Sequence, residues 1–408
     1  MSVVNSRSPS GRSVLHRWML PLLILAVFWA WLISNQINAI NNDSVQYYIG
    51  ATNLWTSGNP YAASAIDLGI SPTAWRFCYP PMLAYLWLPL SCVDLATASR
   101  VWFFVNLLLT VVLAWQLVCI LQINARLAAT VAVFAALLIY PPQSIGMVLG
   151  QSHVLLAVVL IGSYLAVRAN YQVAAGLLLA LAISLKLFPA LVVLAYLAAG
   201  HRRAAWTAVV TCICWCVLTF RQHGEYVDQF VLQPFYPYAA AFNVSMMGLT
   251  KRLFAPSKYA VPVVDAPLIG LTVFLVSALA IVAILIYVAR QRRESALIAA
   301  TYPAMLLLTP VAGLYHCNLV PAAIAIICRD VNSSNRARVL WQGLFAALLL
   351  TGLPPEFGVP RNPEGWRRSW HEWIHEGWGA LLMAPQTYGL ILLLLLIGLY
   401  LCNEKLEN

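Results

Sequence analysis

Residues 267–293 read PLIGLTVFLVSALAIVAILIYVARQRR, an apolar run of helical length that ends in a cluster of arginines. A helix that spans a bilayer needs about 20 consecutive apolar residues, and this run supplies them without a charge before Arg290. Lys and Arg are retained in cytoplasmic loops, so the arginines mark the inner end of the helix. The stretch therefore predicts a transmembrane helix whose orientation is known.

The rest of the chain has the same character. Of its 408 residues, 62% are hydrophobic and 9% are charged, whereas soluble domains carry roughly 25% charged residues. By the length criterion for spanning helices, about 10 to 12 apolar stretches lie between Trp18 and Cys402. We therefore expect an all-α fold, a polytopic transmembrane helical bundle that forms a single membrane-embedded domain over residues 1–408.

The net charge of +10 has a distribution typical of membrane topology rather than of nucleic-acid binding. Basic residues gather between the apolar stretches, as they do in cytoplasmic loops. The clusters are Arg7, Arg12 and Arg17; His201, Arg202 and Arg203; Arg290, Arg292 and Arg293; and Arg329, Arg336 and Arg338. We therefore expect no nucleic-acid partner, a cytoplasmic tail at residues 1–17, and a multi-pass protein of the plasma membrane surrounded by lipid.

Counting spans between these clusters places residues 38–78, 222–266 and 310–316 together on the outer, extracytoplasmic face. Residues 354–384 should lie there too, although they contain Arg367 and Arg368, and their Trp-rich sequence is typical of a helix in the membrane interface. The parity of residues 122–200 stays open. Within them, the apolar segment 173–199 fits either one kinked helix or two half-helices.

The outer segments contain the unusual polar residues. Asp43 follows the first predicted span, where a carboxylate can take a proton from a hydroxyl that arrives from water, or can simply cap the next helix. His316 lies at the outer end of a span, a place where a histidine more often serves structure than catalysis. Lys186 stands in an apolar segment, where a charge is costly unless it is paired, faces a cavity or snorkels to an interface.

Several signatures of other enzyme classes are missing from the sequence. It contains no Gly-rich phosphate loop, no nucleotide-binding βαβ unit and no spacing of His, Cys and Asp that indicates a metal site. The closely spaced Cys212, Cys214 and Cys216 point to different sides of a helix and are interpreted as small apolar filler. We therefore expect no metal and no cofactor, and any group-transfer donor should reach the site through the membrane as a lipid.

The order of several short motifs between about residues 18 and 330 resembles glycosyltransferase family 87, the alpha-mannosyltransferase-like group of the GT-C membrane fold. The motifs are Asp43 followed by Tyr47, Gly58-Asn59-Pro60-Tyr61, Tyr79-Pro80-Pro81, Gly150-Gln151, Ala175-Gly176 with Lys186 and Pro189, Asn243 with Ser245, and Thr309-Pro310 before Tyr315-His316. Each motif is short, and their order carries the resemblance.

This resemblance implies transfer of a hexose, typically mannose, from a polyprenyl-monophosphate sugar to an acceptor hydroxyl at the outer face, with inversion. It implies that Asp43 is the acid/base residue and that His316 is its histidine partner. A lipid phosphate leaves as a stable anion, so a single carboxylate suffices where a glycosidase needs two. Candidate substrate-binding residues are Tyr47, Arg76, Tyr79, Gln151, Lys186, Asn243, Lys251, Arg252, Tyr315, Arg367 and Arg368.

Other functions remain open at this point. A transporter or a flippase of lipid-linked sugars would place polar residues at the membrane midplane in discontinuous helices, which suits the segment around Lys186. The other polar residues, however, gather on one face. A purely structural assembly subunit would give this outer cluster no purpose. The sequence leaves the transferred sugar and the acceptor, a glycolipid or another glycan, undetermined.

Overall fold

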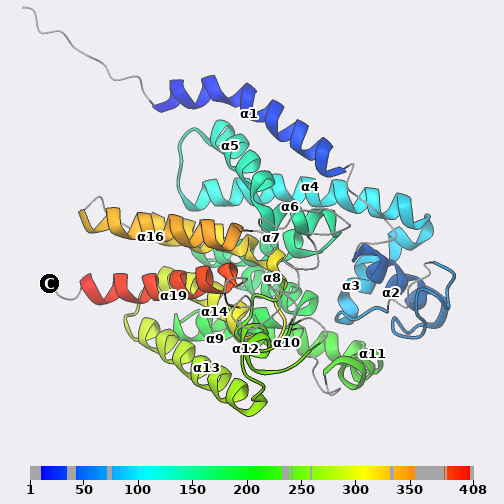
Figure 1. Cartoon of the computed structure of the whole chain (residues 1–408). Helices are drawn as coiled ribbons and strands as arrows, with labels where there is room; N and C mark the ends of the chain where they lie inside the picture. The colour runs from blue at the N-terminus through cyan, green and yellow to red at the C-terminus, as the bar shows by residue number, and fades with distance from the viewer. Residues whose placement is uncertain are drawn as a thin grey trace, which may run out of the picture.

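The computed structural model describes residues 11–34, 43–70, 76–231, 239, 242–257, 260–330, 335–353, 381 and 384–404. These residues form a bundle of α-helices, and within them no strand occurs beyond two isolated bridges (Figure 1). The prediction of an all-α helical membrane bundle is therefore confirmed.

The first half of the chain contains long helices that alternate with short ones. In order they are α1 (Gly11–Ser34), α2 (Ser44–Ser57), α3 (Pro81–Trp87), η1 (Leu88–Cys92), α4 (Leu95–Ile120), α5 (Arg126–Ile139), α6 (Pro141–Val148), α7 (His153–Arg168), α8 (Gln172–Leu185), η2 (Phe188–Ala190) and α9 (Leu191–Ala198). The short α2 and α3 pack on each other at one end of the bundle, at the right of Figure 1.

The second half follows the helix pairs that the arginine clusters predict. Its elements are α10 (Arg202–Leu218), α11 (Phe220–Tyr226), η3 (Val227–Val231), α12 (Met246–Phe254), α13 (Pro267–Arg290), α14 (Glu294–Leu308), η4 (Leu314–Leu319), α15 (Val320–Asp330), α16 (Asn335–Gly352) and α19 (Pro385–Glu404). The predicted turn at residues 310–316 joins α14 to η4 and α15.

Burial separates the centre of the bundle from its lipid-facing surface. Helix α14 is buried along its length from Ser295 to Leu307. The neighbouring α13 buries only Gly270, Ile281 and Val288, and the rest of its apolar surface is exposed or half-buried. An exposed surface this apolar is stable only in a membrane, so α13 faces lipid while α14 forms part of the core.

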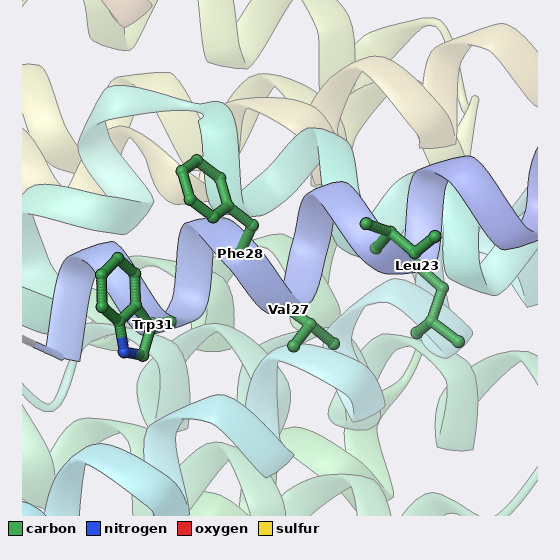
Figure 2. A pocket seen from close by; sticks show the side chains of 5 residues that line it. Leu23, Val27, Phe28 and Trp31 are labelled. Carbon is green, nitrogen blue, oxygen red and sulfur yellow. The ribbon is translucent and has the colours of Figure 1, made fainter.

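Helix α1 shows the same lipid-facing character at the edge of the bundle, packed against α5 (Figure 1). Its outward side carries Leu23, Val27, Phe28 and Trp31 around a shallow apolar hollow, with no polar group among the side chains drawn except the indole nitrogen (Figure 2). The rings of Phe28 and Trp31 stack with their centroids 6.0 Å apart. This face suits contact with lipid chains.

Few helices are long enough to span a bilayer without a break. Among the described residues, α4 and α13 have the length and apolar character for this, and two bent pairs raise the number to at most four. The pairs are α5 with α6, bent by 69°, and α10 with α11, bent by 93°. Nine further apolar helices have 10–17 residues. The predicted count of 10–12 spans therefore stays a prediction, because many apolar stretches are interrupted.

The segment around Lys186 is one of these interruptions, and it settles the question that the sequence left open. Helix α8 ends at Leu185, Lys186 takes an extended conformation, and the chain resumes as η2 and α9 after Pro189. Proline lacks the N–H that a continuous helix would need here. Residues 173–199 are thus two half-helices, with the lysine at the break.

Contacts join the segments that were predicted to share a face. Gln222 donates from its amide to the carbonyl oxygen of Gly58 over 3.1 Å, and Asn59 donates to Glu225 over 2.6 Å. The 242–245 segment pairs with the 310–316 turn, for example through the N–H of Val244 and the carbonyl oxygen of Ala312, 2.8 Å apart. The described parts of residues 38–78, 222–266 and 310–316 are therefore linked by contacts, although the side of the membrane remains a prediction.

Candidate active site

Asp43 stands directly before α2, but its side chain makes no capping hydrogen bond to that helix. Its backbone N–H donates to the carbonyl oxygen of Leu149 over 2.7 Å. Its carboxylate oxygen Oδ2 accepts a hydrogen bond from the side-chain amide of Gln151. The carboxylate is therefore directed away from the helix backbone, and the alternative in which Asp43 serves only as a cap is wrong.

Gln151 connects Asp43 to two tyrosines. Its Nε2 atom also lies 3.1 Å from the hydroxyl of Tyr79, and its Oε1 atom accepts from the hydroxyl of Tyr47 over 3.0 Å. Both Gln151 and Tyr47 are fully buried, and the Tyr47 ring packs against those of Trp87 and Trp102. Their positions suit a supporting role around Asp43 rather than the contact with substrate that the sequence suggested for them.

The loop that carries Gln151 is fastened along its length. The indole N–H of Trp102 donates to the carbonyl oxygen of Gly150 over 2.9 Å. The side-chain amide of Asn318 donates to the backbone carbonyl oxygen of His153 over 3.2 Å. Gly150 has a φ of +68°, and a Cβ atom there would lie 2.8 Å from the Cβ of Ser44. Glycine alone fits this turn without strain, so the loop and the start of α2 approach closely.

Lys186 brings a positive charge to the same place from the break between α8 and α9. Its ammonium lies 4.5 Å from the centre of the Tyr79 ring and 5.8 Å from that of Tyr315. Within the described part of the chain, this ammonium makes no hydrogen bond and no ion pair. We call Asp43, Tyr47, Tyr79, Gln151 and Lys186 the Asp43 cluster.

The electrostatics of Asp43 reflect its position. Burial raises the pKa of its carboxyl above the ordinary value of 3.8, since the charged form loses water. The hydrogen bond from Gln151 and the charge of Lys186 lower it, and burial is the largest of the three effects. A carboxylate that is desolvated yet still directed by a donor is a stronger base than one in water.

His316 lies beside this cluster and is buried. Its Nδ1 atom is 3.1 Å from the carbonyl oxygen of Gly313, which makes Nδ1 the protonated nitrogen and leaves Nε2 as an acceptor. Nε2 is buried and has no hydrogen-bond partner among the described residues. The ring packs against Tyr315 and Phe188, with centroids 4.5 and 5.0 Å apart.

The expected direct pairing of Asp43 with His316 is not seen. Between the residues that the structure describes, no hydrogen bond or ion pair joins the two side chains. The ammonium of Lys186 is close enough to act electrostatically on both. The lysine, which the sequence indicated as one of several substrate-binding residues, is therefore the charged group that acts on both predicted catalytic residues.

Asn243 belongs to a second polar cluster. Its amide donates to the carbonyl oxygen of Pro310 over 3.1 Å and accepts from the N–H groups of Ser245 and Ala312, over 3.2 and 3.0 Å. The backbone carbonyl oxygen of Asn243 accepts from the buried guanidinium of Arg252 over 3.0 Å. We call these five residues the Asn243 clamp, because they fasten the 242–252 segment to the 310–313 turn.

Of the other predicted residues that the structure describes, Tyr315 borders the Asp43 cluster at Lys186, whereas no hydrogen bond or ion pair joins Arg76 or Lys251 to it. Arg76 is exposed and acts electrostatically on Asp67, and Lys251 is half-buried on α12. Tyr315, between Lys186 and His316, is half-buried. Arg367 and Arg368 lie outside the described residues, as does the proposed interfacial segment around them.

Sequence reasoning missed the residues that hold the Gln151 loop. Trp102 is one of 15 tryptophans, and nothing in its local sequence separates it from those that face lipid. Asn318 does carry a signal, because a buried amide two residues beyond His316 in an apolar segment needs a polar partner. That partner, the carbonyl oxygen of His153, depends on tertiary structure and has no local signal.

Comparison with known proteins now bears on this arrangement. The model of the family described as glycosyltransferase family 87 matches residues 77–310, which is more than half of the chain. The chain belongs to glycosyltransferase family 87. No curated protein and no solved structure matches it.

Membership in family 87, together with the apolar helices, makes this protein a membrane glycosyltransferase, with a sugar donor and an acceptor as its substrates. The matched residues include Tyr79, Gln151 and Lys186 of the Asp43 cluster. Asp43 and His316 lie outside the match, so their roles rest on their positions beside those residues. The mannosyltransferase-like character stays a prediction.

Proposed function

We propose that this family 87 enzyme transfers a hexose, in the simplest case mannose, from a polyprenyl-monophosphate sugar to an acceptor hydroxyl at the outer face of the plasma membrane. The observation that carries the proposal is a desolvated carboxylate, Asp43, near an ammonium, Lys186, that makes no ion pair with any described residue. The carboxylate suits removal of a proton from the acceptor hydroxyl, and the ammonium suits binding of the phosphate of the donor.

The proposed reaction is a single displacement. The acceptor oxygen attacks the anomeric carbon as its proton passes to Asp43, and the bond from that carbon to the phosphate oxygen breaks with its electron pair on the phosphate. The configuration at the anomeric carbon inverts. The departing lipid phosphate carries its own negative charge, so it needs positive charge rather than an acid. One carboxylate is then enough, and no metal or cofactor is required.

Each group of the cluster has a part in this scheme. Lys186 stabilises the leaving phosphate, and its contact with the rings of Tyr79 and Tyr315 restrains its position. Nε2 of His316 can accept a hydrogen bond from a sugar hydroxyl. The outward faces of α1 and α13 are apolar and suit contact with lipid. The lipid chain of the donor can therefore stay in the membrane while its sugar reacts. The acceptor, a glycolipid or another glycan, approaches from water.

The test uses purified protein in liposomes that contain polyprenyl-phosphate mannose and a panel of glycolipid acceptors. Transfer of the sugar with release of lipid phosphate, lost in Asp43→Asn, is the expected result. Asp265→Asn makes the same chemical change at an exposed position and should keep full activity. Undiminished transfer by the folded Asp43→Asn protein would overturn the mechanism.

A flippase is the second candidate, and the break between α8 and α9 is the observation that favours it. The same liposomes separate the two functions. Movement of the mannolipid between leaflets, without loss of its sugar to any acceptor, would favour the flippase over the transferase.

A further inference from the structure

We propose that Gln151 is a positioning residue that orients Asp43 and leaves one carboxylate oxygen, Oδ1, as the atom that takes the proton. This inference rests on the proposed function of Asp43 as the base. It gives Gln151 a role that does not require contact with either substrate.

The orientation of the Gln151 amide is fixed from both of its ends. At one end, a carboxylate accepts hydrogen bonds and cannot donate them, so the amide must turn its NH₂ group towards Asp43. At the other end, the hydroxyl of Tyr47 accepts from the backbone N–H of Ser152 over 3.2 Å. The hydroxyl hydrogen of Tyr47 is thus available to donate to Oε1 of Gln151, 3.0 Å away.

These bonds form a chain with one direction. It begins at a backbone N–H, which can only donate, and ends at a carboxylate, which can only accept: Ser152, Tyr47, Gln151 and Asp43 in that order. A reversed amide would place its carbonyl oxygen against the carboxylate and its NH₂ group against a donor. The carboxylate end does not tolerate that reversal, because two acceptors would face each other, so the Gln151 amide has one stable orientation.

The backbone beneath Gln151 supports this orientation. Three backbone carbonyl oxygens of the loop accept hydrogen bonds. That of Leu149 accepts from the N–H of Asp43, that of Gly150 from Trp102, and that of His153 from Asn318. Three elements distant in sequence, α2, α4 and η4, therefore hold the loop. A side chain that is fully buried on such a loop keeps its position when substrates come and go.

The consequence for Asp43 concerns its two oxygens. Gln151 occupies Oδ2, and within the described residues no group bonds to Oδ1. The Asp43 carboxylate is thus held at one oxygen and open at the other. The open oxygen is where the hydroxyl of the acceptor must arrive for its proton to be transferred.

The substitution Gln151→Glu tests this role because it keeps the shape of the side chain and removes the donor. Two carboxyl groups in hydrogen-bond contact share one proton at neutral pH, so Asp43 becomes harder to ionise. The acid limb of kcat/KM for the acceptor should move to higher pH by about 1 unit or more. The KM of the donor should stay near that of the wild type, since Gln151 does not contact it.

The experiment measures kcat and KM against pH in proteoliposomes for the wild type, Gln151→Glu and Asp43→Asn. Gln222→Glu, the same change on α11, serves as the control and should leave the profile in place. Loss of transfer in Asp43→Asn together with a wild-type profile in Gln151→Glu would overturn the inference and leave the base intact. Full activity in Asp43→Asn would instead overturn the proposed function.

Tyr47→Phe provides an independent test if Gln151→Glu does not fold. It removes the hydroxyl that bonds to Oε1 and keeps Gln151 itself, so the amide is restrained only through its NH₂ group, at Asp43 and Tyr79. We expect kcat to fall by roughly 10-fold while KM for both substrates is retained. An unchanged kcat in this variant would show that the amide needs no orienting partner and would overturn the inference.

Discussion

The Asp43 cluster and the Asn243 clamp are both polar and both largely buried, and the two residues that name them, Asp43 and Asn243, lie in segments predicted to be on the outer face. They differ in how far their hydrogen bonding is completed inside the protein. In the clamp, the amide of Asn243 is engaged at its NH₂ group and at its oxygen by neighbouring backbone groups. In the Asp43 cluster, one carboxylate oxygen and one ammonium remain without a bonded partner among the described residues.

This difference distinguishes a cluster with a structural role from a candidate catalytic cluster. A buried amide that is bonded at both its NH₂ group and its oxygen stabilises the fold and has less left to offer a ligand. A charged group that is buried without a full set of partners costs free energy, and proteins retain such groups where a substrate completes them. We therefore propose that transfer takes place at the Asp43 cluster and that the clamp holds the surrounding segments in position.

The largest effect that we expect from the Asp43 cluster, apart from loss of Asp43 itself, comes from Lys186. Lys186→Met keeps much of the apolar stem and removes the charge, which should lower kcat by roughly 100-fold, as loss of one transition-state donor does. Lys186→Arg keeps the charge and should retain more activity. Transfer rates in liposomes measure both, and equal rates for the Met variant and the wild type would remove Lys186 from the phosphate site.

Gly150→Ala should have a smaller effect, and one that acts through the loop. The backbone at position 150 is left-handed, and this conformation costs an alanine about 1 to 2 kcal/mol. The added methyl group would also lie too close to the side chain of Ser44. We expect a lower Tm and a reduced kcat, because the start of α2 carries Asp43. Gly58→Ala, at a similar φ of +73° but in open space, is the matched control and should lower Tm without lowering kcat.

Asn243→Ala should affect stability rather than chemistry. It leaves the N–H groups of Ser245 and Ala312 without their acceptor, and a lost buried partner costs about 1 to 3 kcal/mol. The Tm in detergent should fall while the transfer rate per folded molecule is retained. A large loss of kcat with an unchanged Tm would show that Asn243 binds substrate, as the sequence had suggested.

The smallest effect is a displacement of the pH profile. Because burial raises the pKa of Asp43, its carboxyl takes up a proton at a higher pH than an exposed aspartate would. A base is inactive when protonated, so kcat/KM should fall as the pH drops through a value above 3.8. An acid limb at or below 3.8 in the measured profile would contradict this electrostatic description of the site.

Much of the fold was predictable because hydropathy and charge report directly on the membrane. The predicted span at 267–289 is α13, and the predicted turn at 310–316 joins α14 to η4. The broken apolar stretches were less predictable. Pro189 signalled an interruption, but only the packing of α8 and α9 decides between a kink and two half-helices.

The candidate site was predictable in its residues but not in their partners. Asp43 and Lys186 stood out because a charge near or within an apolar segment is unusual. Gln151 was identified as a substrate ligand, since nothing local shows that a residue 108 positions from Asp43 donates to it. Tyr47 was expected to bind substrate, whereas its ring is buried among Tyr79, Trp87 and Trp102.

The central claim is that the Asp43 cluster performs transfer and the Asn243 clamp does not. Its most direct test measures the transfer rate per folded molecule for Asp43→Asn and Asn243→Ala in the same proteoliposomes, beside the Tm of each. We expect Asp43→Asn to lose at least about 1,000-fold in rate with its Tm retained, and Asn243→Ala to lose Tm with its rate retained. The opposite pattern, an active Asp43→Asn and a folded but inactive Asn243→Ala, would contradict the account.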